Sequence, residues 1–220
     1  MMKILKYVFA ATLIVILSGC TGTFKSGWKN FNAYYNTFYN AEKSYQAGLE
    51  KNLGQGREYN PLLPIRIHPE PINAGMQDFE KAIQKSADIL RKHEESKWVN
   101  DALFIIGKSY YYRQEYFSAD QKFRELYITT DVPEMKQKAI IWQGRVLLDL
   151  ELYSEGVAFL SDQFNNIDNS WRDDHIAELR VIFAQHHVQL QNWEQASEYL
   201  VTGLPEISKK GYKERGYFLL

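Results

Sequence analysis

The sequence has few of the residues and motifs that enzymes and metalloproteins use. Its 220 residues include one cysteine and five histidines, so we expect neither a disulfide framework nor a cysteine-rich zinc site. The adjacent His186 and His187 would point about 100° apart on a helix, which is too divergent for both to bind one metal without a third ligand from elsewhere. No phosphate-binding loop, nucleophile elbow, zinc-protease motif or dinucleotide-binding glycine pattern occurs. We therefore predict a protein that is not an enzyme and has no metal site.

Clustered positive charge is also lacking. The chain has 26 Lys and Arg against 27 Asp and Glu, for a formal net charge of −1. Because nucleic-acid recognition depends on concentrated positive charge, we do not predict nucleic acid as a partner. Without thiol crosslinks, stability must come from packing, and the 15% aromatic content favours a dense core with some adhesive surface.

The first nineteen residues have the order of a secretory signal. Lys3 and Lys6 precede an apolar run at 7–17 (YVFAATLIVIL), and the small residues Ser18 and Gly19 follow it. As a helix, eleven residues span about 17 Å, whereas the hydrocarbon core of a bilayer is about 30 Å thick. We predict a cleaved signal at 1–19, with a short uncleaved signal anchor as the alternative.

The only cysteine follows this run directly. Leu17, Ser18, Gly19 and Cys20 resemble the lipobox of bacterial lipoproteins. This resemblance implies cleavage before Cys20 and lipid attachment to it, and two or three acyl chains would hold the chain stably at a membrane. In that family an Asp after the cysteine favours inner-membrane retention, so Thr21 implies the outer membrane. The alternative roles for Cys20, a buried thiol or a nucleophile, would need a folded environment, which a position so close to the signal rarely offers. We predict no cofactor besides the lipid on Cys20.

A repeat occupies residues 98–210. In NDALFIIGKSYYYRQEYFSADQKFREL, at 100–126, apolar and small residues recur at i, i+3, i+4 and i+7, and a second amphipathic helix follows. Gly107 and Ala119 are placed where two antiparallel helices would approach most closely. The pattern resembles the helical hairpin of a tetratricopeptide repeat, which implies an all-α superhelix. The residues that carry the resemblance are Ala102, Leu103, Ile106, Gly107, Tyr110, Tyr111, Tyr116, Ala119 and Phe123.

Two further copies follow the first. Gly144 lies 37 residues after Gly107, and Ala184 lies 40 residues after Gly144. The third copy departs from the pattern at Ala184 and His187. Spacings above the usual 34 predict longer turns at 129–133 and 165–171. An unrelated helical bundle is the alternative.

The N-terminal third is less regular. Helices predicted at 34–51 and 77–93 form one pair split by an insertion with four of the six prolines, which cannot be regular helix. That insertion is either a functional loop or an extended segment packed over the first helix pair. Residues 213–220 resemble the start of the first helix of another repeat. We therefore expect that the natural protein continues beyond Leu220 or that this end docks on another surface. The predicted order is signal 1–19, lipidated cysteine and tether 20–31, split helix pair 32–97, tetratricopeptide repeats 98–135, 136–174 and 175–210, and a further helix from 211 to 220.

A second stripe on the first helix of each repeat predicts a partner-binding groove. In tetratricopeptide arrays this stripe lines the concave face. We expect an apolar trough in which Lys108 and Arg145 meet acidic groups of an extended or helical peptide. Alternatively, Tyr111 and Tyr112 merely pack against the preceding repeat. The predicted groove residues are Phe104, Lys108, Tyr111, Tyr112, Ile141, Arg145, Leu148, Val181, Gln185 and Val188.

Residues 32–123 carry a more specific resemblance. Together with the lipobox, they contain the stretches YYNTFYNAEKSYQAGLEK, YNPLLPI, FEKAIQKSADILRKH and WVNDALFIIGKSYYYRQEYFSADQKF. These resemble the SprE and PorW group of tetratricopeptide lipoproteins, which is linked to gliding motility and type IX secretion. The resemblance implies a scaffold on the outer membrane that faces the periplasm and binds envelope or secretion-system proteins. The alternatives are a BamD-like assembly subunit, a SusD-like glycan-binding lipoprotein and an adaptor for cell-wall hydrolases.

Overall fold

Helices make up most of the described chain. The computed structural model describes residues 37–220 except 59 and 61, so the predicted signal, Cys20 and its tether lie outside the described residues. Within the described part there are nine α-helices, a short 3-10 helix and no strand, which confirms the prediction of an all-α fold. The α-helices are α3 (Tyr39–Leu53), α4 (Met76–Lys92), α5 (Val99–Tyr112), α6 (Tyr116–Thr129), α7 (Pro133–Asp149), α8 (Tyr153–Asn165), α9 (Asp173–Gln189), α10 (Trp193–Gly203) and α11 (Lys210–Leu219).

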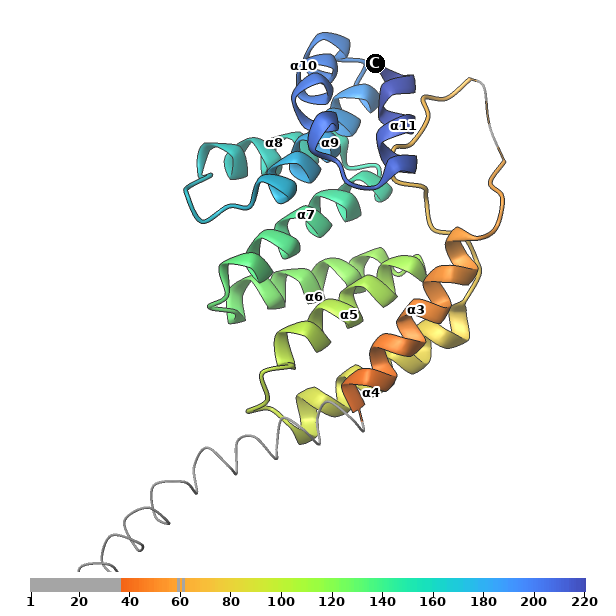
Figure 1. Cartoon of the computed structure of the whole chain (residues 1–220), viewed down its shortest axis with the longest axis vertical. Helices are drawn as coiled ribbons and strands as arrows, with labels where there is room; N and C mark the ends of the chain where they lie inside the picture. Colours follow the sequence, from red (N-terminus) through yellow and green to blue (C-terminus); the bar gives the residue numbers. More distant parts are fainter. Residues whose placement is uncertain (1–36, 59, 61) are drawn as a thin grey trace, which may run out of the picture.

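Neighbouring helices pack as pairs, α3 with α4, α5 with α6, α7 with α8 and α9 with α10, and the pairs stack in chain order (Figure 1). The second of the three C-terminal pairs begins at Pro133 rather than at 136. Proline suits this position because the first turn of a helix has no use for its missing N–H group. The array is curved, and α3 and α11 lie at the two ends of the curve (Figure 1).

The same turn joins the two helices of each of the last three pairs. Gln114, Glu151 and Gln191 each adopt a left-handed backbone, with φ of 64°, 60° and 59°. After α5, the amide of Gln114 donates to the Tyr111 carbonyl, and the amide of Glu115 donates to the Tyr110 carbonyl. Equivalent bonds close α7 and α9. This Schellman arrangement is a common helix ending, and its recurrence at spacings of 37 and 40 residues repeats the sequence period in backbone geometry.

Small residues let the helices of a pair approach closely. A Cβ atom on Gly107 would lie 2.6 Å from the Phe123 ring, and one on Gly144 would lie 3.0 Å from the Leu160 side chain. Phe123 and Leu160 are completely buried, so neither has free space to withdraw into. The third pair has Ala184 at the equivalent position.

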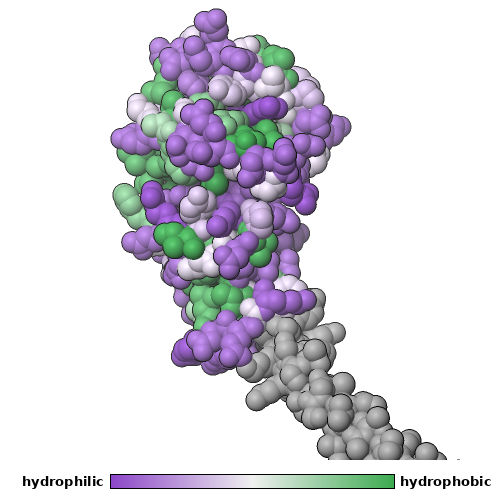
Figure 2. All heavy atoms as spheres, turned by 90° about the vertical axis from the view of Figure 1, so that its left-hand side faces the viewer, coloured by the Kyte–Doolittle hydropathy of each residue, from purple (hydrophilic) through white to green (hydrophobic). Residues whose placement is uncertain are grey.

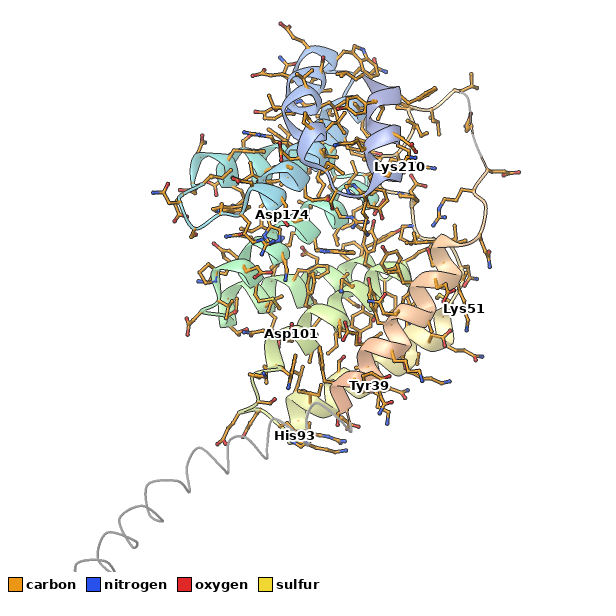
Figure 3. All side chains as sticks on the ribbon, in the orientation of Figure 1. Tyr39, Lys51, His93, Asp101, Asp174 and Lys210 are labelled. Atoms are coloured by element: carbon orange, nitrogen blue, oxygen red, sulfur yellow. The ribbon has the colours of Figure 1, made fainter. Side chains whose placement is uncertain are left out.

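The core runs along the stack instead of forming one centre. Side chains fill the space between successive helices (Figure 3). The face shown in Figure 2 is mainly hydrophilic, with hydrophobic residues interspersed. Within residues 37–220, no helix is both long and apolar enough to cross a bilayer. The same region brings together no group of three His, Cys, Asp or Glu side chains suited to a metal.

Candidate functional site

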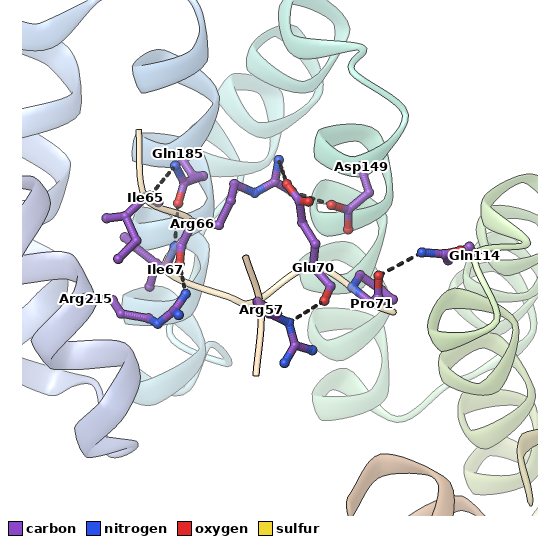
Figure 4. A network of polar contacts seen from close by, with 10 residues as sticks. All are labelled: Arg57, Ile65, Arg66, Ile67, Glu70, Pro71, Gln114, Asp149, Gln185 and Arg215. Carbon is purple, nitrogen blue, oxygen red and sulfur yellow. Dashed lines mark hydrogen bonds and ion pairs between the residues drawn. The ribbon is translucent and has the colours of Figure 1, made fainter. Parts of the chain in front are cut away.

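An extended segment crosses the inner side of the curved array. It comprises residues 64–74, between α3 and α4, and we call it the strap (Figures 1 and 4). Pro64, Pro69 and Pro71 fix φ and remove three N–H groups, which explains why the strap is neither helix nor strand. Its carbonyl groups still need donors, and these come from side chains of the helices around it.

The middle of the strap is bonded to α9 and α11 through its main chain. Gln185, which is 1% exposed, accepts a hydrogen bond from the Ile67 amide at 2.8 Å. The same side chain donates to the Ile65 carbonyl at 3.5 Å. Arg215 of α11 donates to the Arg66 carbonyl at 2.7 Å. Three consecutive strap residues are therefore held by contacts that do not depend on their side chains.

The end of the strap is held in the same way by the N-terminal pairs. Gln114, in the turn after α5, donates to the Pro71 carbonyl at 2.8 Å. Asn52, completely buried near the end of α3, donates to the carbonyls of Ile72 at 2.6 Å and Ala74 at 3.2 Å. Amide side chains of three different helix pairs thus bind the strap backbone.

The strap also forms an ion pair at the end of α7. Arg66 contacts Asp149, the last residue of that helix (Figure 4), and the Asp149 side chain is only 3% exposed. Burial raises the pKa of Asp149 above its ordinary value, although the Arg66 charge acts in the opposite direction. A buried carboxylate without its partner is costly, so Asp149 makes this position select for a cation.

A histidine forms a second polar contact further along the strap. Burial lowers the pKa of His68, which keeps its ring neutral, and Nε2 lies 2.9 Å from the Glu178 carboxylate of α9. Burial alone would raise the pKa of Glu178, but the bond from His68 and the neighbouring positive charges lower it overall. The His68 ring also contacts Tyr212 of α11 edge to face, with 4.8 Å between centroids.

Between Arg66 and His68, one apolar side chain anchors the strap. Ile67 is completely buried and belongs to a core cluster formed by α9, α10 and the residues before α11. Removing a buried isoleucine side chain typically costs about 2–5 kcal/mol. Its cluster contains Ala177, Val181, Ala184, Leu200, Leu204 and Ile207.

The structure buries most of the groove residues predicted from the sequence. Phe104 and Lys108 are half-buried, and the other eight are less than 9% exposed, so the exposure expected of them is wrong. The reason is that side chains of neighbouring helices pack on most of the stripe, and the strap covers part of it. Gln185 contacts the strap directly, and Val181 shares its cluster. That this stripe binds a partner stays a prediction. The buried eight are Tyr111, Tyr112, Ile141, Arg145, Leu148, Val181, Gln185 and Val188.

The two predicted cations are engaged by aromatic rings. The Arg145 guanidinium lies 4.2 Å from the Trp142 ring centre and 5.1 Å from that of Tyr111. Lys108 Nζ lies 4.2 Å from the Tyr45 ring centre, and burial lowers its pKa to about 8. Tyr111 packs on Trp142 of the following pair as well as on its neighbour Tyr112. The acidic side chains that contact strap side chains are Asp149 and Glu178, whereas the cation Arg215 bonds to the strap backbone.

Sequence reasoning missed most of the side chains that hold the strap. Asn52, Gln114, Asp149, Glu178 and Arg215 look like ordinary surface residues in an amphipathic pattern. One signal was available for Gln114. It lies in the turn after α5, at a position that recurs as Glu151 and Gln191 after the first helices of the next two pairs. Tertiary contacts with a segment that has no period determine the others.

Comparison of the sequence with protein-family models and with curated proteins found no match. A functional assignment for this chain therefore depends on the chemistry of the groove and on the sequence patterns described above.

The amide side chain of Gln185 should control how firmly the strap is held. We expect Gln185→Ala to speed hydrogen exchange at the Ile67 amide by roughly fivefold, because a hydrogen bond of this kind contributes about 1 kcal/mol. Gln189→Ala, one turn further along α9 at a half-buried position, is the matched control and should leave that rate unchanged. Exchange measured on strap peptides by mass spectrometry distinguishes the two, and equal rates in both variants would contradict the assigned bond.

Proposed function

We propose that the chain is a non-enzymatic scaffold of tetratricopeptide repeats that binds other proteins of the cell envelope. The observation that carries this proposal is the groove, where side chains of several helix pairs bind the backbone of an extended segment. Helical-repeat arrays offer such extended concave surfaces for binding peptides. The repeated turn and the close approach at Gly107 support the tetratricopeptide assignment.

We also propose that the scaffold is tethered to the outer membrane by lipid on Cys20 and faces the periplasm. The support comes from the sequence around Cys20 and from Thr21 after it. About twelve residues separate Cys20 from the first predicted helix, and they reach at most about 40 Å when extended. A groove held so near the membrane is at high effective concentration for envelope proteins. Type IX secretion or gliding motility is the process we propose, from the resemblance of residues 32–123.

Loss of the lipid should release the protein. Cys20→Ser removes the only thiol, and we expect the membrane-bound fraction to fall by at least about tenfold, because acyl chains supply the binding energy. Ser18→Ala keeps a small residue before the cleavage site and should remain bound. Fractionation of envelopes with intact mass analysis measures both. A Cys20→Ser protein that stays in the membrane, or an unmodified wild-type thiol, would contradict the tether.

The partner class can be tested with the same proteins. We expect the wild-type chain, purified from detergent-solubilised envelopes, to co-purify secretion or motility proteins. A polysaccharide with its transporter would instead indicate a glycan-binding lipoprotein, and a peptidoglycan enzyme would indicate a hydrolase adaptor. Either of these results would overturn the proposed process.

A further inference from the structure

The strap is much longer than the connection between α3 and α4 requires. The other helix pairs are joined by three residues each, at 113–115, 150–152 and 190–192, whereas residues 54–75 join α3 to α4. A short turn suffices for antiparallel neighbours. The additional residues extend to α9 and α11, at the other end of the described array, and fill the groove there.

The groove holds the strap as a binding site holds an extended peptide. Main-chain bonds supply affinity without regard to sequence, and pockets for individual side chains supply selectivity. Here the pockets are Asp149 for Arg66, the apolar cluster for Ile67 and Glu178 for the following histidine. Together they specify an arginine, a β-branched residue and a hydrogen-bond donor in consecutive positions.

The groove cannot remain empty at low cost. With the strap in place Gln185 and Asp149 are almost completely buried and bond to it. An empty groove would lose these bonds and would expose to water the apolar cluster around Ile67. The stretch before the strap is held less firmly, since Leu62 and Leu63 are 88% and 62% exposed. A replacement ligand therefore has an accessible starting point and must supply the same contacts.

From these contacts we infer that the strap occupies a peptide-binding groove in cis, and that the groove binds a partner's extended, proline-containing segment with arginine followed by a β-branched residue. This inference rests on the proposed scaffold function. Because the strap is attached to the chain, it competes at a high effective concentration. The apparent affinity for a separate peptide is lowered by the fraction of molecules whose groove is free.

Substitutions in the strap and in the groove that holds it should have opposite effects on peptide binding. The probe is a fluorescent peptide of residues 63–73, LPIRIHPEPIN, added to the purified full chain. We expect Arg66→Ala combined with Ile67→Ala to tighten binding by at least about tenfold over wild type, because the weakened strap frees the groove. Adding Asp149→Asn or Gln185→Ala to that variant should abolish the gain. Leu62→Ala, at an exposed position, is the matched control and should bind as wild type does.

The measurement is fluorescence anisotropy, with far-ultraviolet circular dichroism to verify the helical fold. A folded strap variant that does not bind the peptide overturns the inference, as does equal binding of a peptide with glutamate in place of its arginine. If the double variant does not fold, Arg66→Ala alone is judged by the same criteria. Dimer formation in place of peptide binding would assign the groove to a second copy and also overturn the inference. None of these outcomes affects lipidation or co-purification of the wild type, which test the scaffold proposal separately.

Discussion

The Gly156→Ala variant is expected to lose about 2–3 kcal/mol of unfolding free energy, the cost typical of overpacking a filled core. Gly156 lies in the first turn of α8, and a Cβ atom there would be 2.0 Å from Cε1 of His186 and 2.4 Å from its Nδ1. The ring cannot withdraw easily, because it is completely buried and its Nε2 donates to the Gly144 carbonyl at 2.9 Å. Urea unfolding at neutral pH measures the loss.

Two further variants separate this overlap from a general effect of helix substitution. At Gly211 of α11, a Cβ atom would have no neighbouring atom within 4 Å, so Gly211→Ala should raise stability by up to about 1 kcal/mol through helix propensity alone. His186→Ala removes the ring that the new methyl group would strike. The Gly156→Ala and His186→Ala double variant should therefore be more stable than the sum of the single effects by at least about 1 kcal/mol. Strict additivity would refute the overlap.

The helices could be predicted because their apolar positions recur with helical spacing and local signals mark their ends. The pattern from Leu103 to Tyr110 has one face buried against a neighbour, and the period returns at Gly144. The same pattern predicts that two helices approach closely at Gly107, where the structure leaves no room for a side chain beside the Phe123 ring. Such features depend on residues near one another in sequence, which is why a single sequence is enough to find them.

The groove could be predicted only in part because its occupant comes from a distant segment. The predicted concave stripe includes Gln185, but the strap has no periodicity, and nothing local indicates that Ile67 would meet α9. The charged residues that hold the strap could not be predicted for the same reason. Lys108 and Arg145 are conspicuous in the stripe, yet aromatic rings surround them, and Asp149 at the end of α7 forms the contact with the strap.

Acidification should destabilise the fold through His186. Burial lowers the pKa of this histidine to about 4 in the folded protein, whereas the unfolded value is about 6.5. Between these values the unfolded chain binds more protons than the folded chain, so stability is retained above about pH 6.5 and lost as the pH falls towards 4. For His186 alone the loss between pH 7 and pH 5 is about 2 kcal/mol. Burial also lowers the pKa of His68, His175 and His187, which adds in the same direction.

The His186→Gln variant isolates this contribution. A glutamine amide can donate to the Gly144 carbonyl as the ring does, but it does not titrate. We therefore expect the variant to lose less stability than wild type between pH 7 and pH 5, by about 2 kcal/mol in urea unfolding. Burial raises the pKa of Asp149, so that carboxyl favours the fold as the pH falls, equally in both proteins, and cancels from the comparison. Equal losses in the two proteins would mean that the His186 ring accepts a proton in the folded state as readily as in the unfolded one, which a buried ring against a carbonyl should not do.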